Sequence, residues 1–149
     1  MSNPKEDLIA TLKRTLANTY VLYLKTQNFH WNVKGPMFHS LHTLFEEQYT
    51  EQAAAIDEIA ERLRALGVYA PGSFSAFKEL SQISESEDYI PAVEMVKELA
   101  SDQQVLRGIV GEGIAHASEL GDDVTADLLT QRAHVHEKNA WMLSSSLGG

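Results

Sequence analysis

The sequence predicts an all-α protein, a four-helix bundle with a short extra helix in the connection between the second and third long helices. Apolar residues recur at helical spacing along four long stretches of the chain. Strand signals are lacking, because no alternating apolar runs are joined by tight Asn-Gly or Asp-Gly turns. The middle connection is long for two successive helices, and four long helices with one such connection are typical of a bundle.

The first long helix is expected between Pro4 and the Gly35-Pro36 pair, which interrupts the helical pattern. Asn3 is suited to cap this helix, Pro4 to its first turn, and Glu6 stands at the capping-box position. The apolar residues that follow helical spacing are Ile9, Leu12, Leu16, Tyr20, Tyr23 and Leu24.

The second long helix is expected over about residues 37–66, which corresponds to a length of roughly 45 Å. Gly67 is suited to end it in a left-handed conformation. Its apolar side is formed by Leu41, Leu44, Phe45, Ile56, Ile59 and Leu63. The short extra helix is expected next, over residues 73–80, with Phe74 and Phe77 as its anchors.

The third long helix is expected from about Asp88 to Gly121, with Pro91 in its first turn. Three glycines in its interior each weaken it by up to about 1 kcal/mol relative to alanine. They either permit close contact with another helix or mark a bend, and they are Gly108, Gly111 and Gly113. The fourth long helix is expected from Asp122 or Asp123 to about Ser146, since acidic residues stabilise helix N-termini.

Length and composition fit one soluble globular domain over residues 1–149, of which 44% are hydrophobic and 22% charged. The absence of cysteine excludes disulfides, thiolate metal sites and cysteine nucleophiles. The first eight residues lack the apolar core of a signal peptide, and no apolar run approaches the roughly 20 residues of a membrane span. We therefore expect a cytoplasmic protein that does not enter a membrane.

The net charge of −9 bears on the partners of the protein. Nucleic-acid binding depends on Lys and Arg neutralising phosphates, so this charge argues against DNA binding as a function. An acidic protein attracts cations, although acidic charge that only aids solubility accounts for the same number. The start of the chain has Lys5 followed by Glu6 and Asp7, and residues 144–149 carry no basic side chain, so no Lys-rich tail is expected.

The residues best suited to chemistry are two histidines and three carboxylates: His30, His42, Glu46, Asp57 and Glu61. His42 and Glu46 are four residues apart, as are Asp57 and Glu61, so each pair shares a helix face. Sets of histidine and carboxylate ligands suit Fe, Mn or Zn. Taken alone, each pair is more typical of a solvated helix surface than of a metal site.

The spacing between the two pairs indicates how they would meet. His42 and Asp57 are fifteen residues apart, which is roughly 22 Å along a straight helix. Ligands of one ion lie only a few ångströms apart, so one continuous helix cannot bring both to the same metal. Two copies of the helix, antiparallel about a two-fold axis, would bring the His end of one to the Asp/Glu end of the other and create two sites. His30 would complete the His end.

An alternative is a di-iron site inside one bundle, which uses a Glu-x-x-His pair on each of two helices. This sequence contains no Glu-x-x-His, so the intrachain design is disfavoured and an intersubunit site remains open.

Several stretches resemble the Dps family, the mini-ferritins named as DNA-binding proteins from starved cells. They are NFHWNVKGP at residues 28–36, LH at 41–42, FEE at 45–47, DEIAERL at 57–63, DDVT at 122–125 and WM at 141–142. The short helix expected in the middle connection is similar to that family too. The resemblance implies a ferritin-like subunit of a hollow dodecamer, which oxidises Fe²⁺ at two-fold interfaces, preferably with hydrogen peroxide rather than O₂. It further implies storage of ferric mineral and protection against oxidative stress.

The resemblance also assigns residues. His30, His42 and Glu46 would come from one subunit, and Asp57 and Glu61 from its partner, as the catalytic iron ligands. The cargo would be Fe²⁺ and Fe³⁺, and Zn²⁺ is a surrogate that the same ligands would accept.

Two further roles follow from the family resemblance. Trp31 would scavenge stray oxidising equivalents near the site, with Tyr49 a lesser candidate, although packing accounts for Trp31 as well. Helix capping explains one acidic residue at the start of the fourth helix, whereas three suggest an acidic pore for iron entry at a three-fold axis. These residues are Asp122, Asp123 and Asp127.

The other four histidines are given no role, and surface or interface positions are expected for them: His39, His116, His134 and His136. Two other functions stay open beside the ferroxidase. One is a DNA-compacting module with little oxidation, which the lack of a basic tail disfavours. The other is a purely structural oligomer, which the complete ligand set disfavours.

Overall fold

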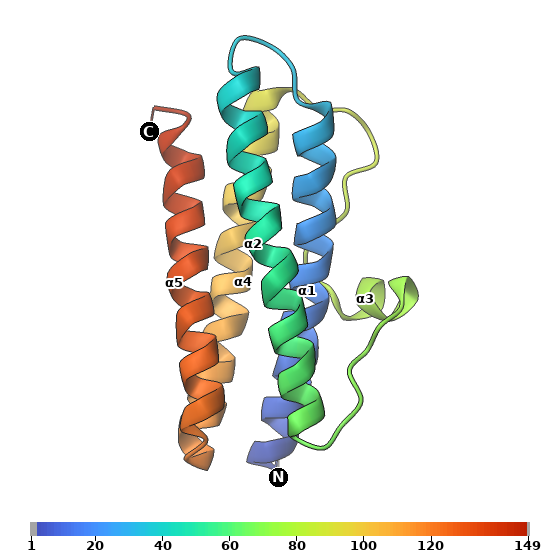
Figure 1. Ribbon diagram of the computed structural model, residues 1–149, viewed down its shortest axis with the longest axis vertical. Coiled ribbons are helices and arrows are strands. Elements are labelled where there is room, and N and C mark those ends of the chain that lie inside the picture. The colour runs from blue at the N-terminus through green and yellow to red at the C-terminus, as the bar shows by residue number, and fades with distance from the viewer. Residues whose placement is uncertain (1–2, 149) are drawn as a thin grey trace.

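The computed structural model describes residues 3–148, and within that range it consists of five α-helices and no strand. The helices are α1 (Pro4–Asn32), α2 (Phe38–Ala65), α3 (Phe74–Leu80), α4 (Ala92–Leu120) and α5 (Asp123–Ser145). Four long helices form one bundle, and the short α3 lies outside it beside α1 (Figure 1). The predicted all-α bundle with a short extra helix is confirmed.

The direction of each helix follows from its connection. In Figure 1, α1 and α5 run one way along the bundle, while α2 and α4 run the other way. The pairs α1–α2 and α4–α5 are antiparallel neighbours joined by short turns, whereas α2 and α4 are joined by the long segment that carries α3. α1 contacts α2, α3 and α4, so it is the central helix of the arrangement.

Local chemistry explains where the helices begin and end. The Asn3 side chain accepts hydrogen bonds from the backbone N–H of Lys5 at 2.9 Å and of Glu6 at 3.4 Å, as the predicted cap requires. Gly67 has φ 94° and Gly121 has φ 70°, a region that favours glycine at helix ends.

The predicted start of the third long helix near Asp88 is wrong, because α4 begins at Ala92. Pro91 is the capping residue and not part of the first turn, with an extended backbone at φ −60° and ψ 153°. A residue that precedes a proline is biased toward extended conformations, which keeps Ile90 out of the helix. The helix starts once the Pro91 carbonyl accepts from the N–H of Met95 at 3.0 Å.

The core lies along the bundle axis and includes Leu12, Leu16, Leu22, Phe29, Phe45, Ile59, Leu63, Leu99, Leu106, Leu129 and Leu143. Two apolar residues that the sequence placed on buried helix faces do not belong to this core. Leu24 is 40% exposed, and Phe74 is 76% exposed, so Phe74 does not anchor α3. Of the two phenylalanines, Phe77 does so, buried and stacked on Tyr20 with ring centroids 4.8 Å apart.

One of the three glycines of α4 permits close contact with another helix. A Cβ added at Gly113 would come within 2.7 Å of the Leu129 side chain of α5, whereas at Gly108 it would meet nothing. α4 continues as one helix through all three glycines. Gly113 therefore allows α4 and α5 to approach each other. Within residues 3–148, no helix is long and apolar enough to cross a membrane.

Candidate metal centre

His30 and His42 meet where α1 ends and α2 begins. The turn between the two helices passes through Gly35, whose φ of 111° reverses the chain within a few residues. The two imidazole rings stack with centroids 3.8 Å apart and an angle of 13° between their planes. His30 is buried at 6% exposure, and His42 is half-buried.

The two histidines hold each other in a defined orientation. His30 Nδ1 lies 2.7 Å from the backbone carbonyl oxygen of His42, and His42 Nδ1 lies 2.7 Å from that of His30. A carbonyl oxygen only accepts, so each Nδ1 must carry the hydrogen and donate. In the neutral ring, each Nε2 then keeps its lone pair, which is the form that binds a metal ion. The reciprocal contacts thus leave the Nε2 lone pairs of both rings available to a metal ion.

Glu46 lies close to the two histidines, one turn after His42 on α2. Its Oε1 is 3.6 Å from His30 Nε2, and its side chain is 58% exposed. Tyr49 is adjacent, with its ring centroid 5.2 Å from that of His30. The structure therefore brings together three of the five predicted ligands, and we call His30, His42 and Glu46 the histidine half-site.

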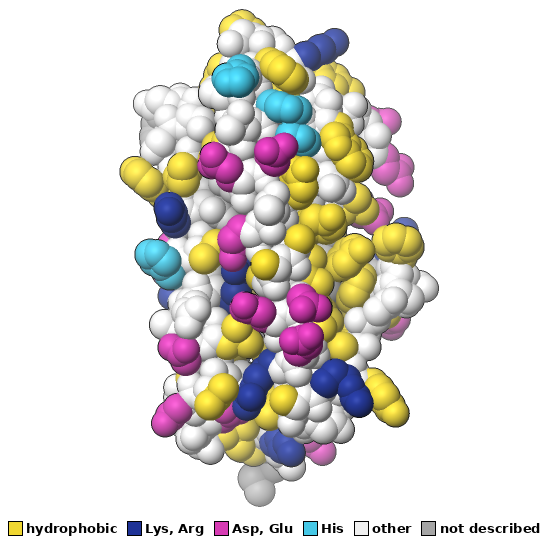
Figure 2. Space-filling model, in the orientation of Figure 1, with side chains coloured by type: hydrophobic (Ala, Val, Ile, Leu, Met, Phe, Trp, Pro, Cys, Tyr) yellow, Lys and Arg dark blue, Asp and Glu magenta, His cyan; other side chains and the backbone are white. Residues whose placement is uncertain are grey.

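Asp57 and Glu61 lie further along α2, exposed and one turn apart, and we call them the acidic half-site. α2 is a single uninterrupted helix, so the roughly 22 Å between His42 and Asp57 is not shortened by a break. Figure 2 shows histidine side chains gathered near the end of the bundle where α2 begins and acidic side chains gathered further along that helix. Within residues 3–148 of one chain, no three His, Asp or Glu side chains converge closely enough to hold a metal ion.

The two half-sites are placed evenly about the middle of α2. His42 is four residues from the first residue of the helix, Phe38, and Glu61 is four residues from the last, Ala65. Glu46 and Asp57 are each eight residues from the corresponding end. At about 100° per residue, all four side chains lie within an arc of roughly 100° on one face.

The three acidic residues at the start of α5 are used differently. Asp122 caps the helix by accepting from the backbone N–H of Thr125 at 3.0 Å, and it pairs with Arg62 of α2 at 3.3 Å. Burial favours a raised pKa for Asp122, but the hydrogen bonds from Thr125 and the charge of Arg62 outweigh it and lower that pKa. Asp123 and Asp127 are exposed, and Asp127 accepts from Gln131 at 2.9 Å.

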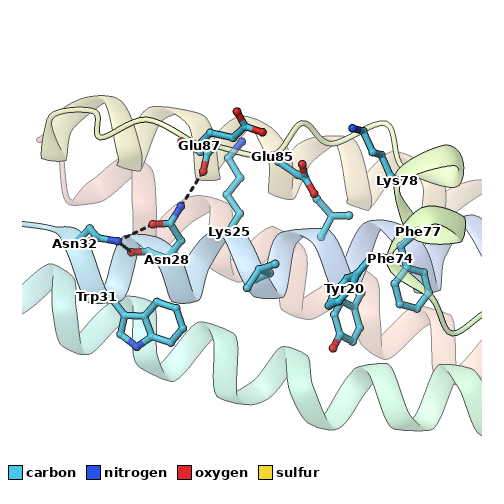
Figure 3. Close-up of a pocket in the computed structure, with 13 residues that line it drawn as sticks. Tyr20, Lys25, Asn28, Trp31, Asn32, Phe74, Phe77, Lys78, Glu85 and Glu87 are labelled. Carbon is cyan, nitrogen blue, oxygen red and sulfur yellow. Dashed lines mark hydrogen bonds between the residues drawn. The ribbon is translucent and has the colours of Figure 1, made fainter.

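Trp31 follows His30 in sequence but lies on another side of α1. Its indole is 61% exposed and lines a groove of about 400 Å³ between α1, α3 and the segment before α4. Figure 3 shows Trp31 at one end of this groove and Tyr20, Phe74 and Phe77 at the other. Asn28 ties the groove to the segment before α4, because its side chain donates to the Ser86 carbonyl at 2.9 Å.

A buried polar layer in the bundle was not predicted. His136 was expected at a surface or interface, yet it is fully buried, and its Nδ1 lies 2.7 Å from Gln103 Oε1. Burial, and then the nearby Arg132 and Arg107, hold the pKa of His136 well below its ordinary value. A signal was present in the sequence, because His136 stands seven residues from both Leu129 and Leu143 on the buried face of α5.

Two glutamines of α2 also belong to this interior. Gln48 and Gln52 are buried one turn apart, and their side-chain amides find no hydrogen-bond partner among the described residues. Nearby, the buried Arg132 pairs with Glu51 across α5 and α2. Among the described residues, the interior near α2, α4 and α5 therefore carries several buried polar side chains but no cluster of carboxylates that could hold a metal ion.

Comparison with known proteins gives consistent matches over nearly the whole chain. The sequence model of the ferritin family, described as a ferritin-like domain, matches residues 9–149. DNA protection during starvation protein 2 of Bacillus anthracis is 39% identical, over 95% of this chain and 97% of that protein.

Solved structures match as well. Dps from Thermosynechococcus elongatus is 34% identical with a TM-score of 0.93, covering 97% of this chain and 92% of that one. Dps from Vibrio cholerae, described as a member of a broad superfamily of ferritin-like diiron-carboxylate proteins, is 34% identical with a TM-score of 0.92, covering 97% and 91%.

Proposed function

Since the chain belongs to the ferritin-like family and, within it, to the Dps proteins, we propose that it is a ferroxidase that stores iron. It oxidises Fe²⁺, preferably with hydrogen peroxide, at sites shared between two copies, and keeps the ferric product inside a hollow dodecamer. Family membership supports iron storage and protection in general. The observation that carries the specific proposal is the even placement of the two half-sites about the middle of α2.

That placement suits a two-fold interface. When two copies of α2 lie antiparallel with their midpoints together, a residue four positions from the start of one faces the residue four positions from the end of the other. His42 then faces Glu61 of the second copy, and Glu46 faces its Asp57. Each interface would hold two equivalent sites, and His30 would complete each one.

The surface between the half-sites supports close approach of such a copy. Ala53 and Ala54 are exposed on the stretch of α2 that separates Glu46 from Asp57, and small side chains let helices approach. Beside α2, Figure 2 shows apolar side chains gathered on the side toward α3. Leu24, Trp31 and Phe74 are exposed there at 40%, 61% and 76%, which is typical of a surface that a partner covers.

The chemistry of the combined site fits iron as the substrate. Carboxylates are hard donors that stabilise Fe³⁺, while imidazole nitrogen also accepts Fe²⁺, and Zn²⁺ is able to occupy the same ligands. Two Fe²⁺ ions each give one electron to hydrogen peroxide, and with two protons the products are two Fe³⁺ and two waters. This two-electron route avoids release of a hydroxyl radical. The net charge of −9 per chain favours the approach of cations.

Two accessory roles belong to the same proposal. Asp123 and Asp127 would line an acidic pore for iron entry at a three-fold axis, with Asp122 holding the start of α5 in place through Arg62 and Thr125. Trp31 would act as a trap for stray oxidising equivalents where the partner subunit covers the groove. Both roles remain predictions.

Mixed assemblies provide the test. We expect His30→Ala/His42→Ala chains and Asp57→Ala/Glu61→Ala chains each to lose peroxide-driven iron oxidation when assembled alone, because every site lacks one half. In an equal mixture, half of the interfaces pair the two variants, and each such interface keeps one intact site, so activity returns to about a quarter of wild type. Activity is read by absorbance after anaerobic Fe²⁺ loading and peroxide addition.

A matched control is the exposed His39→Ala/Glu58→Ala chain, which should oxidise iron at the wild-type rate. Verified mixed assemblies that recover no activity would contradict shared sites. Full activity in either variant alone would contradict the assigned ligands.

A further inference from the structure

The His42 imidazole is enclosed between two other rings. It stacks on His30 with centroids 3.8 Å apart and 13° between the planes. It also stacks on Phe38 with centroids 4.9 Å apart and 23° between the planes. A second ring on the face that His30 covers would clash with His30, so Phe38 covers the opposite face of His42.

The start of α2 places Phe38 in this position. Phe38 is the first residue of the helix, and its backbone N–H donates to the Gly35 carbonyl at 3.0 Å. His42 follows four residues later on the same face, and helical side chains lean toward the N-terminus, so His42 reaches back over the phenyl ring. Phe38 is 41% exposed and does not belong to the hydrophobic core. Packing of the bundle therefore does not account for its contact with His42.

The contact fixes the direction of the His42 lone pair. His42 Nδ1 is held 2.7 Å from the His30 carbonyl oxygen, and the stacked rings on both faces hold the plane of the imidazole. The Nε2 lone pair lies in that plane, so its direction is set as well. A bound metal ion draws electron density out of an imidazole, and an electron-poor ring is attracted more strongly to the negative face of a phenyl ring. The contact with Phe38 thus favours the metal-bound form of His42.

We propose that Phe38 is a positioning residue for iron binding, which holds the His42 imidazole in its ligating orientation and shields its outer face from water. The inference rests on the proposed ferroxidase function. Phe38 neither binds the ion nor exchanges electrons with it, and it acts only through His42. Its loss should therefore weaken binding of the metal ion and leave the oxidation step itself unchanged.

The proposed subunit contact leaves room for this ring. Phe38 and Ala65 are the first and last residues of α2, so antiparallel copies with their midpoints together place Phe38 opposite Ala65 of the second copy. Ala65 is exposed, and its small side chain does not displace the phenyl ring from His42. The same arrangement that joins the two half-sites therefore keeps the stack intact.

The test measures Zn²⁺ binding to the metal-free assembly by isothermal titration, because Zn²⁺ accepts the same ligands and is not oxidised. Phe38→Leu keeps an apolar side chain but removes the ring face, and we expect Zn²⁺ affinity to fall by about tenfold, as is typical for residues that orient metal ligands. Phe38→Tyr keeps the ring face and should bind Zn²⁺ as the wild type does. Tyr69→Leu removes an 82% exposed ring in the segment after α2 and is the matched control, with unchanged affinity expected.

Kinetics separate positioning from catalysis. In Phe38→Leu, the KM for Fe²⁺ should rise by about the same factor as the Zn²⁺ dissociation constant, while kcat at saturating Fe²⁺ stays near the wild-type value. Size-exclusion chromatography checks that the variants form assemblies of wild-type size. If Phe38→Leu does not assemble, Phe38→Met, which is apolar and unbranched, provides the same comparison. A crystal structure of the metal-free variant should show the His42 ring turned away from its wild-type plane.

Failure of the positioning role is distinguishable from failure of the proposed function. Unchanged Zn²⁺ affinity in an assembled Phe38→Leu protein overturns the positioning role, as does a lower kcat with an unchanged KM. Equal weakening by Phe38→Leu and Phe38→Tyr overturns it too, because the ring face would then not matter. Wild-type protein that oxidises no iron overturns the ferroxidase proposal, whereas the Zn²⁺ titrations still report on Phe38.

Discussion

His136 shows how its surroundings decide the protonation of a single side chain. It is fully buried, its Nδ1 faces the Gln103 side-chain oxygen, and the cationic Arg132 and Arg107 are close. Burial and these two charges disfavour the imidazolium, so the pKa of His136 lies well below its ordinary value. The residue is therefore a neutral component of the bundle interior.

This lowered pKa predicts a pH dependence of stability. Below pH about 6.5, His136 of the unfolded chain becomes protonated while His136 of the folded chain stays neutral. The free energy of unfolding therefore decreases as the pH is lowered. The loss of stability caused by His136 is confined to pH values below about 6.5. The free energy of unfolding decreases there by at most about 1.4 kcal/mol per pH unit. We expect His136→Gln, which keeps a polar group near Gln103 but does not titrate, to flatten the urea-unfolding profile of the metal-free protein in this range.

The exposed His39→Gln provides the control and should leave that slope unchanged. A slope that persists in His136→Gln would place the titration at other groups.

At the scale of the elements, most of the fold was predictable because helix signals are local. Asn3, Gly67 and Gly121 act on backbone groups within a few residues, and periodic apolar residues mark the buried faces. The wrong start of α4 comes from the local effect of Pro91 on the residue before it, whereas the error at α3 arose where a tertiary contact decides. Phe74 and Phe77 look alike in sequence, but only Phe77 reaches Tyr20.

The candidate site was predictable to a similar extent. The spacing of His30, His42 and Glu46 indicated one half-site, and the structure places these three side chains together. The carbonyl contacts that orient the imidazoles depend on the geometry of the α1–α2 turn, which residue types alone do not reveal. The union with Asp57 and Glu61 depends on a second chain and stays a prediction.

The contact between α4 and α5 predicts opposite effects for two glycine substitutions. Gly113→Ala should lower the free energy of unfolding by about 1–3 kcal/mol, because the added Cβ lies within 2.7 Å of Leu129 and the helices must separate. Gly108→Ala, where the Cβ meets nothing, should raise it by up to about 1 kcal/mol through helix propensity alone. Denaturant unfolding of both variants measures the contrast. Equal effects of the two substitutions would mean that α4 and α5 do not depend on Gly113 for their contact.

At the scale of the whole molecule, charge decides which partners approach. Each chain carries a net charge of −9, and an assembly multiplies that charge over one surface. Duplex DNA is itself densely anionic, so long-range repulsion opposes contact while iron cations are attracted. The acidic surface is thus consistent with a protein whose cargo is a metal ion.

We therefore expect no appreciable retention of duplex DNA in a gel-shift experiment at physiological salt. A variant with an appended Lys-rich segment serves as the positive control and should bind in a salt-sensitive manner, since added lysines neutralise phosphates. Tight, salt-sensitive binding by the unmodified assembly would show that a local basic surface overcomes the net charge.

The even placement of ligands about the middle of α2 makes the number of residues in that helix as important as their identity. One residue inserted or deleted between Glu46 and Asp57 would turn one pair by about 100° relative to the other and move it about 1.5 Å along the axis. The carboxylates and imidazoles would all survive, yet they would aim at different points in space. With sites shared as proposed, we therefore expect divergence in this stretch to be restricted to exchange of one amino acid for another, whereas the surface loops remain open to changes of length.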